Sequence, residues 1–530
     1  MQEIHIKNQF TRDKVMIKGI FSQIKYDIQA SIVVFLVALP LCLGIALASE
    51  APMFSGVIAG IIGGVVVGFL SGSALGVSGP AAGLVAIVLA AQKSLGSWET
   101  FLLAGFIAGI FQVIAGFLRG GIIAYYFPSA VIKGMLCGIG IIIILKQIPH
   151  LIGYDISPIL TDLTNGRFEF FYIREAIDNL NPGVVIISML SIFILITWQI
   201  LVKKGYKFFE LVQAPLVVVL FGFLLAWIFN TGWFGFHLQP SQLVQIPEFK
   251  SIADLTQSIA FPDFSQFTNL EVYRVAAVIA LVASLESLLC VEATDKLDPL
   301  KRVTPTDREL KAQGVGNMLS SLIGGLPITQ VIIRSSTNIT FGAKSKLSAI
   351  LHGFFLLISI LAIPTLLNEI PLASLAAILV MIGYKLASPS LFKQMYQMGW
   401  EQFLPFIITV VGIVLSDLLI GISVGFGVAI FIILRHHYLN AHDTSIVMKE
   451  GIVFHMELAE EVSFLNKGNI IHQLKRIPPK ATLIIDGTRS KFVDSDVRGV
   501  ISDFLENAKS RQITVEMRGI PASNTPFAAE

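Results

Sequence analysis

Two charged residues of this 530-residue chain lie within strongly apolar stretches, and both indicate ion chemistry. Glu286 lies in the run ALVASLESLL, and Arg334 follows apolar residues in the run IGGLPITQVIIRSSTNITFG. An ionised side chain at mid-membrane costs at least about 2.5 kcal/mol and is retained mainly where it serves a function. Glu286 is therefore expected to bind a coupling cation or proton. The alternative is that it is a structural partner of Arg334 or of helix N-termini.

Residues 72–90 and 323–342 are two apolar stretches interrupted by glycine or proline. Broken helices survive in lipid only where protein surrounds them, and a matched pair of them indicates a transporter's binding site. Each would begin a half-helix, whose first turn offers free N–H groups and about half a positive charge. Two such ends facing each other would hold a small oxyanion. The candidate residues are Ser78, Gly79, Pro80 and Ala81 in the first stretch, and Gln330, Val331 and Ile332 in the second.

Arg334 is expected one turn inside the second half-helix, where it would add positive field for an anion. A salt bridge to Glu286 is the alternative role for this arginine.

The composition is that of an integral membrane protein. Hydrophobic residues make up 54% of the chain and charged residues 14%, against about 25% charged in soluble domains. No basic cluster with interleaved aromatic residues indicates nucleic acid as a partner. Cys42, Cys137 and Cys290 all lie in apolar runs, so neither a disulfide framework nor a zinc site is expected.

Fourteen apolar segments are long enough, or nearly so, to be spans. They fall into two sets of seven, and in each set the third member is short and broken. An odd number of spans per set inserts the two sets in opposite orientations, as an inverted repeat. The first set lies near residues 28–48, 54–70, 79–92, 99–117, 122–144, 182–202 and 211–230, and the second near 272–291, 308–325, 331–342, 346–364, 371–386, 401–416 and 417–435.

The charges predict the orientation. Residues 1–27 form a polar segment, and an N-terminus in the cytoplasm would make every even-to-odd connection cytoplasmic. Those connections carry most of the basic residues, as the positive-inside rule requires. They include Arg119, Lys203, Lys204, Lys296, Lys301, Arg302, Lys344 and Lys346. The multi-pass domain, residues 28–435, is therefore expected in the cytoplasmic membrane with both termini inside.

Beyond residue 435 the composition becomes that of a soluble domain. Strand patterns alternate with helical patterns at residues 467–474 and 495–509, which predicts a small α/β domain over residues 443–519. Residues 520–530 form a short polar tail.

Several motifs together make the chain resemble the SulP family of anion transporters, of the solute-carrier-26 type. They are ALPLCLGIALAS in the first span, SGPAAG in the third, SLESLL in the eighth and GGLPITQVIIRSSTNI around the tenth. The C-terminal segment is similar to a STAS domain. The resemblance implies a seven-plus-seven inverted repeat with core and gate domains, an elevator-like motion and a homodimer. It implies no cofactor.

The resemblance also suggests roles for individual residues. Glu286 matches the acid that couples sodium or protons in bacterial members, and Arg334 matches an arginine beside the anion in animal members. Leu41 and Ile45 fall where first-span residues line the pocket. Gln330, Val331 and Ile332 stand where cyanobacterial bicarbonate transporters have small and hydroxyl residues. Cys290 replaces a threonine-type sodium ligand, so proton coupling at Glu286 is at least as plausible as sodium there.

The resulting hypothesis is a secondary transporter of a small inorganic anion, bicarbonate before sulfate, driven by a sodium or proton gradient. The alternatives are a channel-like anion conductor and a nucleobase carrier of the same inverted-repeat fold. An enzyme is not expected. The pattern Gly421-Ile-Ser423-Val-Gly425 matches a hydrolase nucleophile elbow, but it lies inside an apolar span instead of at a strand-to-helix turn.

Overall fold

A computed structural model describes the backbone of residues 2–520, with gaps at 123–127, 154–179, 207, 210–211, 232–235, 249–253, 255–257, 417, 440–441 and 449–451. Side chains are also outside the description at 2–23, 122, 418–419, 436–439, 442–448, 452, 465 and 510. Almost all of the predicted tail, residues 521–530, therefore lies outside the described residues. The chain divides into two units, residues 1–399 with 406–424 and residues 400–405 with 425–530.

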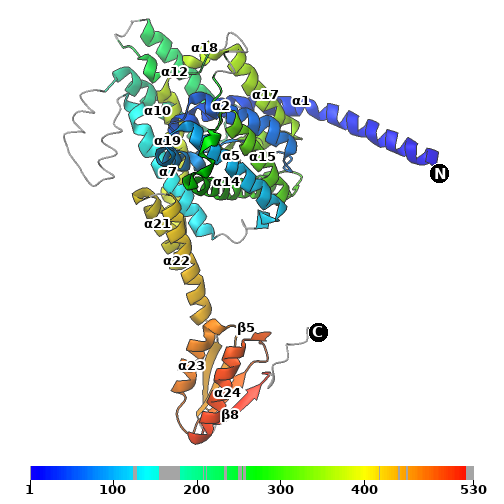
Figure 1. Ribbon diagram of the computed structural model, residues 1–530, viewed down its shortest axis with the longest axis vertical. Helices are drawn as coiled ribbons and strands as arrows, with labels where there is room; N and C mark the ends of the chain where they lie inside the picture. Colours follow the sequence, from blue (N-terminus) through cyan, green and yellow to red (C-terminus); the bar gives the residue numbers. More distant parts are fainter. Residues whose placement is uncertain are drawn as a thin grey trace. The chain divides into compact units, whose positions relative to one another are not determined.

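The first half of the larger unit is a series of helices that ends before a long connection (Figure 1). Helix α2 continues through a π-helical turn (Gly63–Val67) into the short α3 (Gly68–Leu70). Ser97 and Asn181 cap α5 and α10, because their side chains accept hydrogen bonds from the first-turn N–H groups. The helices are α1 (Gln2–Ala48), α2 (Met53–Ile62), α4 (Val85–Leu95), α5 (Trp98–Phe117), α7 (Ser129–Ile152), α10 (Pro182–Lys203) and α12 (Ala214–Asn230).

The second half is again a series of helices, of which α21 and α22 are shared with the smaller unit. Its helices are α14 (Leu270–Leu297), α15 (Thr306–Leu322), α16 (Ile332–Thr340), α17 (Leu347–Ala362), α19 (Leu372–Leu386), α21 (Trp400–Leu415) and α22 (Leu418–Leu439), with the short α18 (Pro364–Asn368) and α20 (Pro389–Gln397) between them. The packing of the two halves is reciprocal. Helix α5 packs along α15 and α14, and its counterpart α17 packs along α2 and α1.

Seven helices of the described residues are long and apolar enough to cross a membrane. They cover Ile24–Ala48, Met53–Leu70, Trp98–Phe117, Ser129–Ile152, Pro182–Lys203, Leu270–Leu297 and Leu372–Gln397. Shorter apolar helices lie at Ala82–Leu95, Ala214–Asn230, Leu347–Ala362, Trp400–Leu415 and Ile420–Arg435. The predicted span at residues 308–325 is the helix α15, but it is not among these apolar helices, since buried polar side chains line it.

Close helix packing in this unit depends on small residues. A Cβ atom added to Gly64 in the π-helical turn would lie 2.7 Å from the Cα of Gly353 in α17. The two backbones therefore touch at this point, as small residues allow in membrane helices. The main apolar core lies between α1, α2, α17 and α19, with contributions from α10 and α12.

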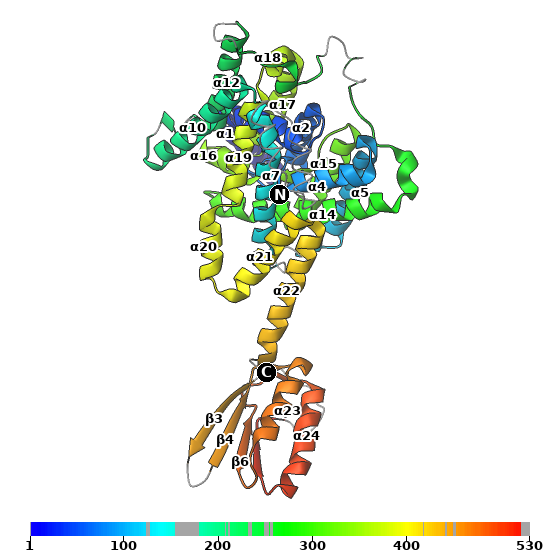
Figure 2. The same cartoon turned by 90° about the vertical axis from the view of Figure 1, so that its left-hand side faces the viewer.

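The smaller unit contains a four-stranded sheet of order β3-β4-β6-β8. Its strands are β3 (His442–Met448), β4 (Ile452–Leu458), β6 (Thr482–Asp486) and β8 (Thr514–Arg518). The β3–β4 pair is antiparallel and the other pairs are parallel. Helices α23 (Lys467–Arg476) and α24 (Ser495–Ser510) lie side by side next to the sheet (Figure 2). The order of strands and helices matches the predicted α/β pattern, and buried Leu483, Ile485 and Val497 are part of its core.

Candidate functional site

The two broken stretches meet in a short antiparallel strand pair. Strand β1 (Ser78–Pro80) pairs with β2 (Ile328–Gln330), with Ser78 opposite Gln330 and Gly79 opposite Thr329. Each strand runs directly into a helix start. A 3₁₀ turn (Ala82–Leu84) leads from β1 into α4, and α16 begins right after β2. The structure therefore brings the predicted anion-binding residues of both stretches together.

The two helix starts have almost the same backbone geometry. The N-cap of the 3₁₀ turn, Ala81, has φ −115° and ψ 138°, and the N-cap of α16, Val331, has φ −115° and ψ 119°. The first N–H groups of a helical turn generally have no intrahelical acceptor, although the Leu84 N–H in the first stretch bonds the Ala81 carbonyl at 3.2 Å. Such a pair of turns can bind an anion through the main chain.

Residues Ser78 and Gln330 share one face of the strand pair, which lies against α14 and α15. The Ser78 Oγ accepts a hydrogen bond of 2.8 Å from Gln313 Nε2 of α15. The Gln330 Nε2 donates to Thr294 Oγ1 of α14 at 3.0 Å. Both predicted anion-binding side chains already have protein partners, so their contribution to an anion site would come from the backbone.

The opposite face of the strand pair lies against Arg334. A Cβ atom added to Gly79 would lie 2.1 Å from Arg334 Nη1, so only glycine leaves room for the guanidinium. Arg334 is fully buried and its Nη2 donates to Cys42 Sγ at 3.3 Å, while Nε and Nη1 have no partner among the described residues. No ion pair of the described residues joins Arg334 to Glu286, so the salt-bridge alternative is not found in this structure.

Helix α14 carries the predicted coupling residues, and each of them meets a different helix start. At Gly83, in the 3₁₀ turn before α4, an added Cβ atom would lie 2.6 Å and 2.7 Å from the two carboxyl oxygens of Glu286, so the carboxyl lies close against the backbone of this turn. The thiol of Cys290 lies near the backbone N–H of Ile332, the first residue of α16. The Oε2 atom of Glu286 is buried and has no partner among the described residues. One helix therefore touches both half-helix starts through residues spaced one turn apart.

A sodium ion at Glu286 would need further ligands. Within the described residues, no group of three or more His, Cys, Asp and Glu side chains is placed to hold a metal ion. Sodium at this position stays a prediction. Its remaining ligands would have to be hydroxyl or backbone oxygens, which Na⁺, like other hard cations, accepts.

A cavity of about 470 Å³ reaches the second broken stretch. It opens between α1, α10, α12, α16 and α19, and Leu41 and Ile333 are in its wall. Leu41 lines this cavity, whereas Ile45, one turn later, is buried and is not among the lining residues, and the role of both residues in anion binding stays a prediction. The exposed lysines Lys203 and Lys385 also line the cavity, and their charges favour anions there.

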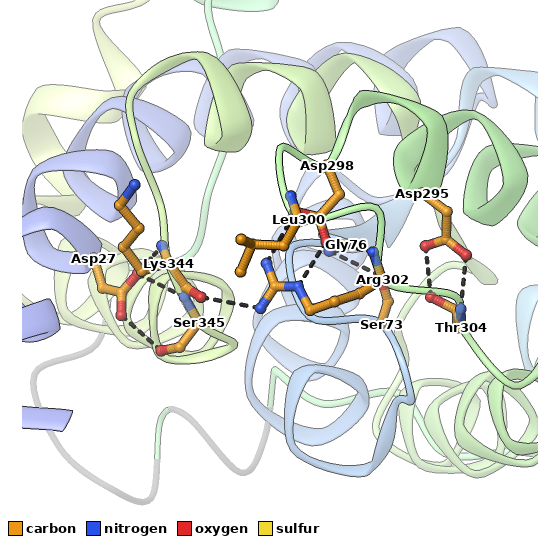
Figure 3. A network of polar contacts seen from close by, with 10 residues as sticks. All are labelled: Asp27, Ser73, Gly76, Asp295, Asp298, Leu300, Arg302, Thr304, Lys344 and Ser345. Atoms are coloured by element: carbon orange, nitrogen blue, oxygen red, sulfur yellow. Dashed lines mark hydrogen bonds and ion pairs between the residues drawn. The ribbon is translucent and has the colours of Figure 1, made fainter. Parts of the chain in front are cut away.

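A polar network ties the loops around this site together (Figure 3). Asp27 of α1 accepts hydrogen bonds from the backbone N–H groups of Lys344 and Ser345, at 2.7 and 3.0 Å. Arg302, in the loop after α14, donates to the Lys344 carbonyl at 3.2 Å and pairs with Asp298 at 2.6 Å. Burial raises the pKa of Asp298, but hydrogen bonds from Arg302 and the Leu300 N–H, with the Arg302 charge, hold that pKa below its usual value.

Sequence reasoning did not identify Gln112, Glu309, Gln313 and Asn317, which surround the strand pair. The last three lie four residues apart on α15 and are all fully buried. A polar stripe at helical spacing was the available signal. The length of the segment nevertheless predicts an ordinary span, which hides the stripe.

Together, the multi-span helical fold and the paired broken segments are those expected of a membrane transport protein. The comparisons agree. Residues 24–409 match the model of the sulfate permease family, and the chain belongs to that family.

Relatives of the chain are named as anion transporters. The chain is 28% identical to the putative sulfate transporter YvdB of Bacillus subtilis, over 91% of this chain and 89% of that protein. It is 27% identical to the bicarbonate transporter BicA of Picosynechococcus sp., over 78% of this chain and 70% of that protein. These proteins are transporters, which confirms the prediction that the chain is not an enzyme.

Solved structures show the same fold. The transmembrane domain of a cyanobacterium BicA matches 77% of this chain and 98% of its own length, with a TM-score of 0.63 and 22% identity. The inward-facing murine solute carrier 26 family member A9 matches 94% of this chain and 86% of its own, with a TM-score of 0.74 and 14% identity. The multi-span helical fold is therefore confirmed.

Proposed function

We propose that the chain is a secondary transporter that binds a small inorganic oxyanion at the β1–β2 strand pair. The main support for this proposal is that two half-helix starts with matching backbone geometry lie together. A cavity whose lining includes Lys203 and Lys385 lies next to the second of them. Main-chain N–H groups and helix dipoles would hold the anion. Such binding is weak enough to permit release, which a transporter requires.

Bicarbonate is the favoured substrate and sulfate the next. The relatives include both a bicarbonate and a sulfate transporter, so family membership leaves both open. Purified protein in proteoliposomes should take up labelled bicarbonate faster than labelled sulfate when both are supplied at equal concentration. Uptake of sulfate without bicarbonate would reverse the order of preference.

A sodium or proton gradient would drive transport through Glu286. Its carboxyl is buried at the start of α4 with one oxygen unpartnered, so either a proton or a sodium ion would complete it. The thiol of Cys290 is a poor ligand for sodium, which favours the proton. Imposing each gradient separately on the same proteoliposomes distinguishes the two.

The architecture proposed for this cycle is a seven-plus-seven inverted repeat with core and gate domains that move in an elevator-like manner. The reciprocal packing of α5 with α15 and of α17 with α2 supports the repeat. The α/β unit is proposed to be a STAS domain, and the protein a homodimer in the cytoplasmic membrane with both termini inside. Cross-linking in native membranes and protease protection of a C-terminal tag test these two assignments.

Two alternatives make different predictions. A channel-like conductor would carry anion current without accumulation against a gradient. A nucleobase carrier of the same fold would be inhibited by uracil. The buried Arg334 on the strand pair favours an anion over a neutral base.

A further inference from the structure

Helix α15 crosses both strands of the β1–β2 pair with a stripe of buried polar side chains. Glu309, Gln313 and Asn317 lie four residues apart, so they share one face of the helix. The carboxylate of Glu309 accepts hydrogen bonds from Ser71 Oγ and, at 2.8 Å, from Gln313 Nε2. Glu309 and Gln313 are therefore hydrogen-bonded to each other, and Asn317, one turn further along the same face, has partners of its own.

Asn317 binds both main-chain groups of one strand residue. Its Oδ1 accepts from the Ile328 N–H at 2.5 Å, and its Nδ2 donates to the Ile328 carbonyl at 3.1 Å. These groups of Ile328 face the outer edge of the strand pair, because the sheet has two strands and the neighbouring cross-strand bond joins the Val331 N–H to the Val77 carbonyl. Unpaired backbone groups at a strand edge are costly in a membrane interior. Asn317 supplies the hydrogen-bond partners that a neighbouring strand would otherwise provide.

The other strand is held from the same helix face. Gln313 Nε2 donates to Ser78 Oγ at 2.8 Å, directly on β1. The stripe is anchored on two further helices, because Asn317 Nδ2 donates to Gln112 Oε1 of α5 at 2.7 Å and Gln112 Nε2 donates to Ser284 of α14 at 3.2 Å. One side of one helix therefore binds both strands and is itself held in place.

We propose that Asn317 and Gln313 are positioning residues for the anion site, which set the register and spacing of the two half-helix starts. This inference rests on the proposed function, since the site it positions is the proposed anion site. Neither side chain touches the anion. They act through Ile328 and Ser78, and an error of about 1 Å in the spacing of the two helix starts weakens anion binding.

The transport experiment compares Asn317→Leu, which removes both bonds to Ile328, with Asn317→Asp, which keeps the acceptor for the Ile328 N–H. In proteoliposomes with labelled bicarbonate and labelled sulfate, Asn317→Leu should raise KM at least tenfold and leave kcat within twofold. Asn317→Asp should give a smaller increase. Ser321→Ala, a buried position on the same helix, is the matched control and should leave both constants unchanged.

A second readout does not depend on transport. Cysteines introduced together at Ser78 and Gln330, which lie opposite each other, should form a disulfide readily in the full-length protein. Adding Asn317→Leu should lower the yield of that disulfide at least fivefold, and adding Ser321→Ala should not change it. Where Asn317→Leu is not obtained as folded protein, Gln313→Met replaces it, with an expected threefold rise in KM.

Unchanged KM in both Asn317→Leu and Gln313→Met, or a loss confined to kcat, would overturn the positioning role, as would an unchanged disulfide yield. A wild-type protein that takes up neither anion would instead contradict the proposed function. The disulfide yield would then still decide whether Asn317 holds the strand pair.

Discussion

The two broken segments begin their helices in the same way but have different surroundings. At the first, the small Gly83 lets the carboxyl of Glu286 reach the backbone of the turn before α4. At the second, the equivalent position is Ile333, which faces the cavity, and the next residue is the buried Arg334. None of the residues that line the cavity comes from the first segment, all of which is described. The first segment thus meets an acid, and the second borders the cavity and carries the buried Arg334, whose guanidinium lies against Gly79 of the first segment.

This difference suggests that the two broken segments have different roles in transport. A carboxyl at a positive helix start competes with an anion while it is ionised and stops competing once it is neutralised. Binding of a proton or a sodium ion to Glu286 would therefore make the first helix start available to the anion. In this proposal the first segment provides coupling, and the second provides access and selectivity.

The largest effect is expected from Glu286→Gln. The amide stays neutral whatever the cation gradient, so gradient-driven uptake of labelled bicarbonate should fall to the level of protein-free vesicles. Anion exchange without a gradient should persist, because both helix starts remain. Glu292→Gln on the same helix, an exposed residue paired with Lys296, is the control and should retain accumulation. Accumulation that survives in Glu286→Gln would mean that the first segment is not the coupling side.

Gly83→Ala tests whether coupling at the first segment depends on the close approach of the Glu286 carboxyl to the backbone of Gly83. The added Cβ would lie 2.6 Å from Glu286 Oε2, so the carboxyl has to move. Displacing a functional group by about 1 Å can cost up to about 100-fold in rate, and we expect a loss of roughly tenfold in gradient-driven uptake. In the second segment Ile333→Ala should cost only about threefold, since it removes part of an apolar wall.

The control for Gly83→Ala is Gly68→Ala, where the nearest atom to an added Cβ is 3.4 Å away. Equal losses in Gly83→Ala and Ile333→Ala would contradict the division between the segments.

Arg334→Met is expected to weaken anion binding while it increases the thermal stability of the protein. The guanidinium is buried with two nitrogens unpartnered among the described residues, which is costly for the folded state. Its removal should raise the thermal unfolding midpoint of the detergent-solubilised protein. It should also raise KM for the anion about tenfold, equivalent to ~1.4 kcal/mol of lost attraction. A lower midpoint, or an unchanged KM, would show that Arg334 serves the fold and not the anion.

The sequence allowed the main parts of the site to be predicted, because local signals mark them. Breaks at Gly79-Pro80 and a lone acid at Glu286 violate the regularity of a membrane span, and such violations are visible without a fold. The soluble α/β unit was equally visible from its alternating pattern.

The partners of these residues could not be predicted. Pairing of β1 with β2 joins residues about 250 positions apart. The face on which Arg334 lies depends on its rotamer and on space left by Gly79, neither of which a sequence pattern determines. Charge alone would permit a salt bridge between Arg334 and Glu286. Only the placement of the two side chains against different neighbours argues against it.

The smallest effect is expected at the mouth of the second segment's cavity. Lys203→Gln combined with Lys385→Gln removes two charges from the cavity lining without touching either helix start. Long-range attraction between exposed charges is screened over about 10 Å at 0.1 M salt and about 3 Å at 1 M. The double variant should therefore raise KM by about twofold at low ionic strength, and the difference should vanish at high salt. Lys393→Gln, an exposed residue of α20 outside the cavity, should have no effect at either salt concentration. A rise in KM that persists at high salt would place the lysines in direct contact with the anion and move part of the binding site away from the strand pair.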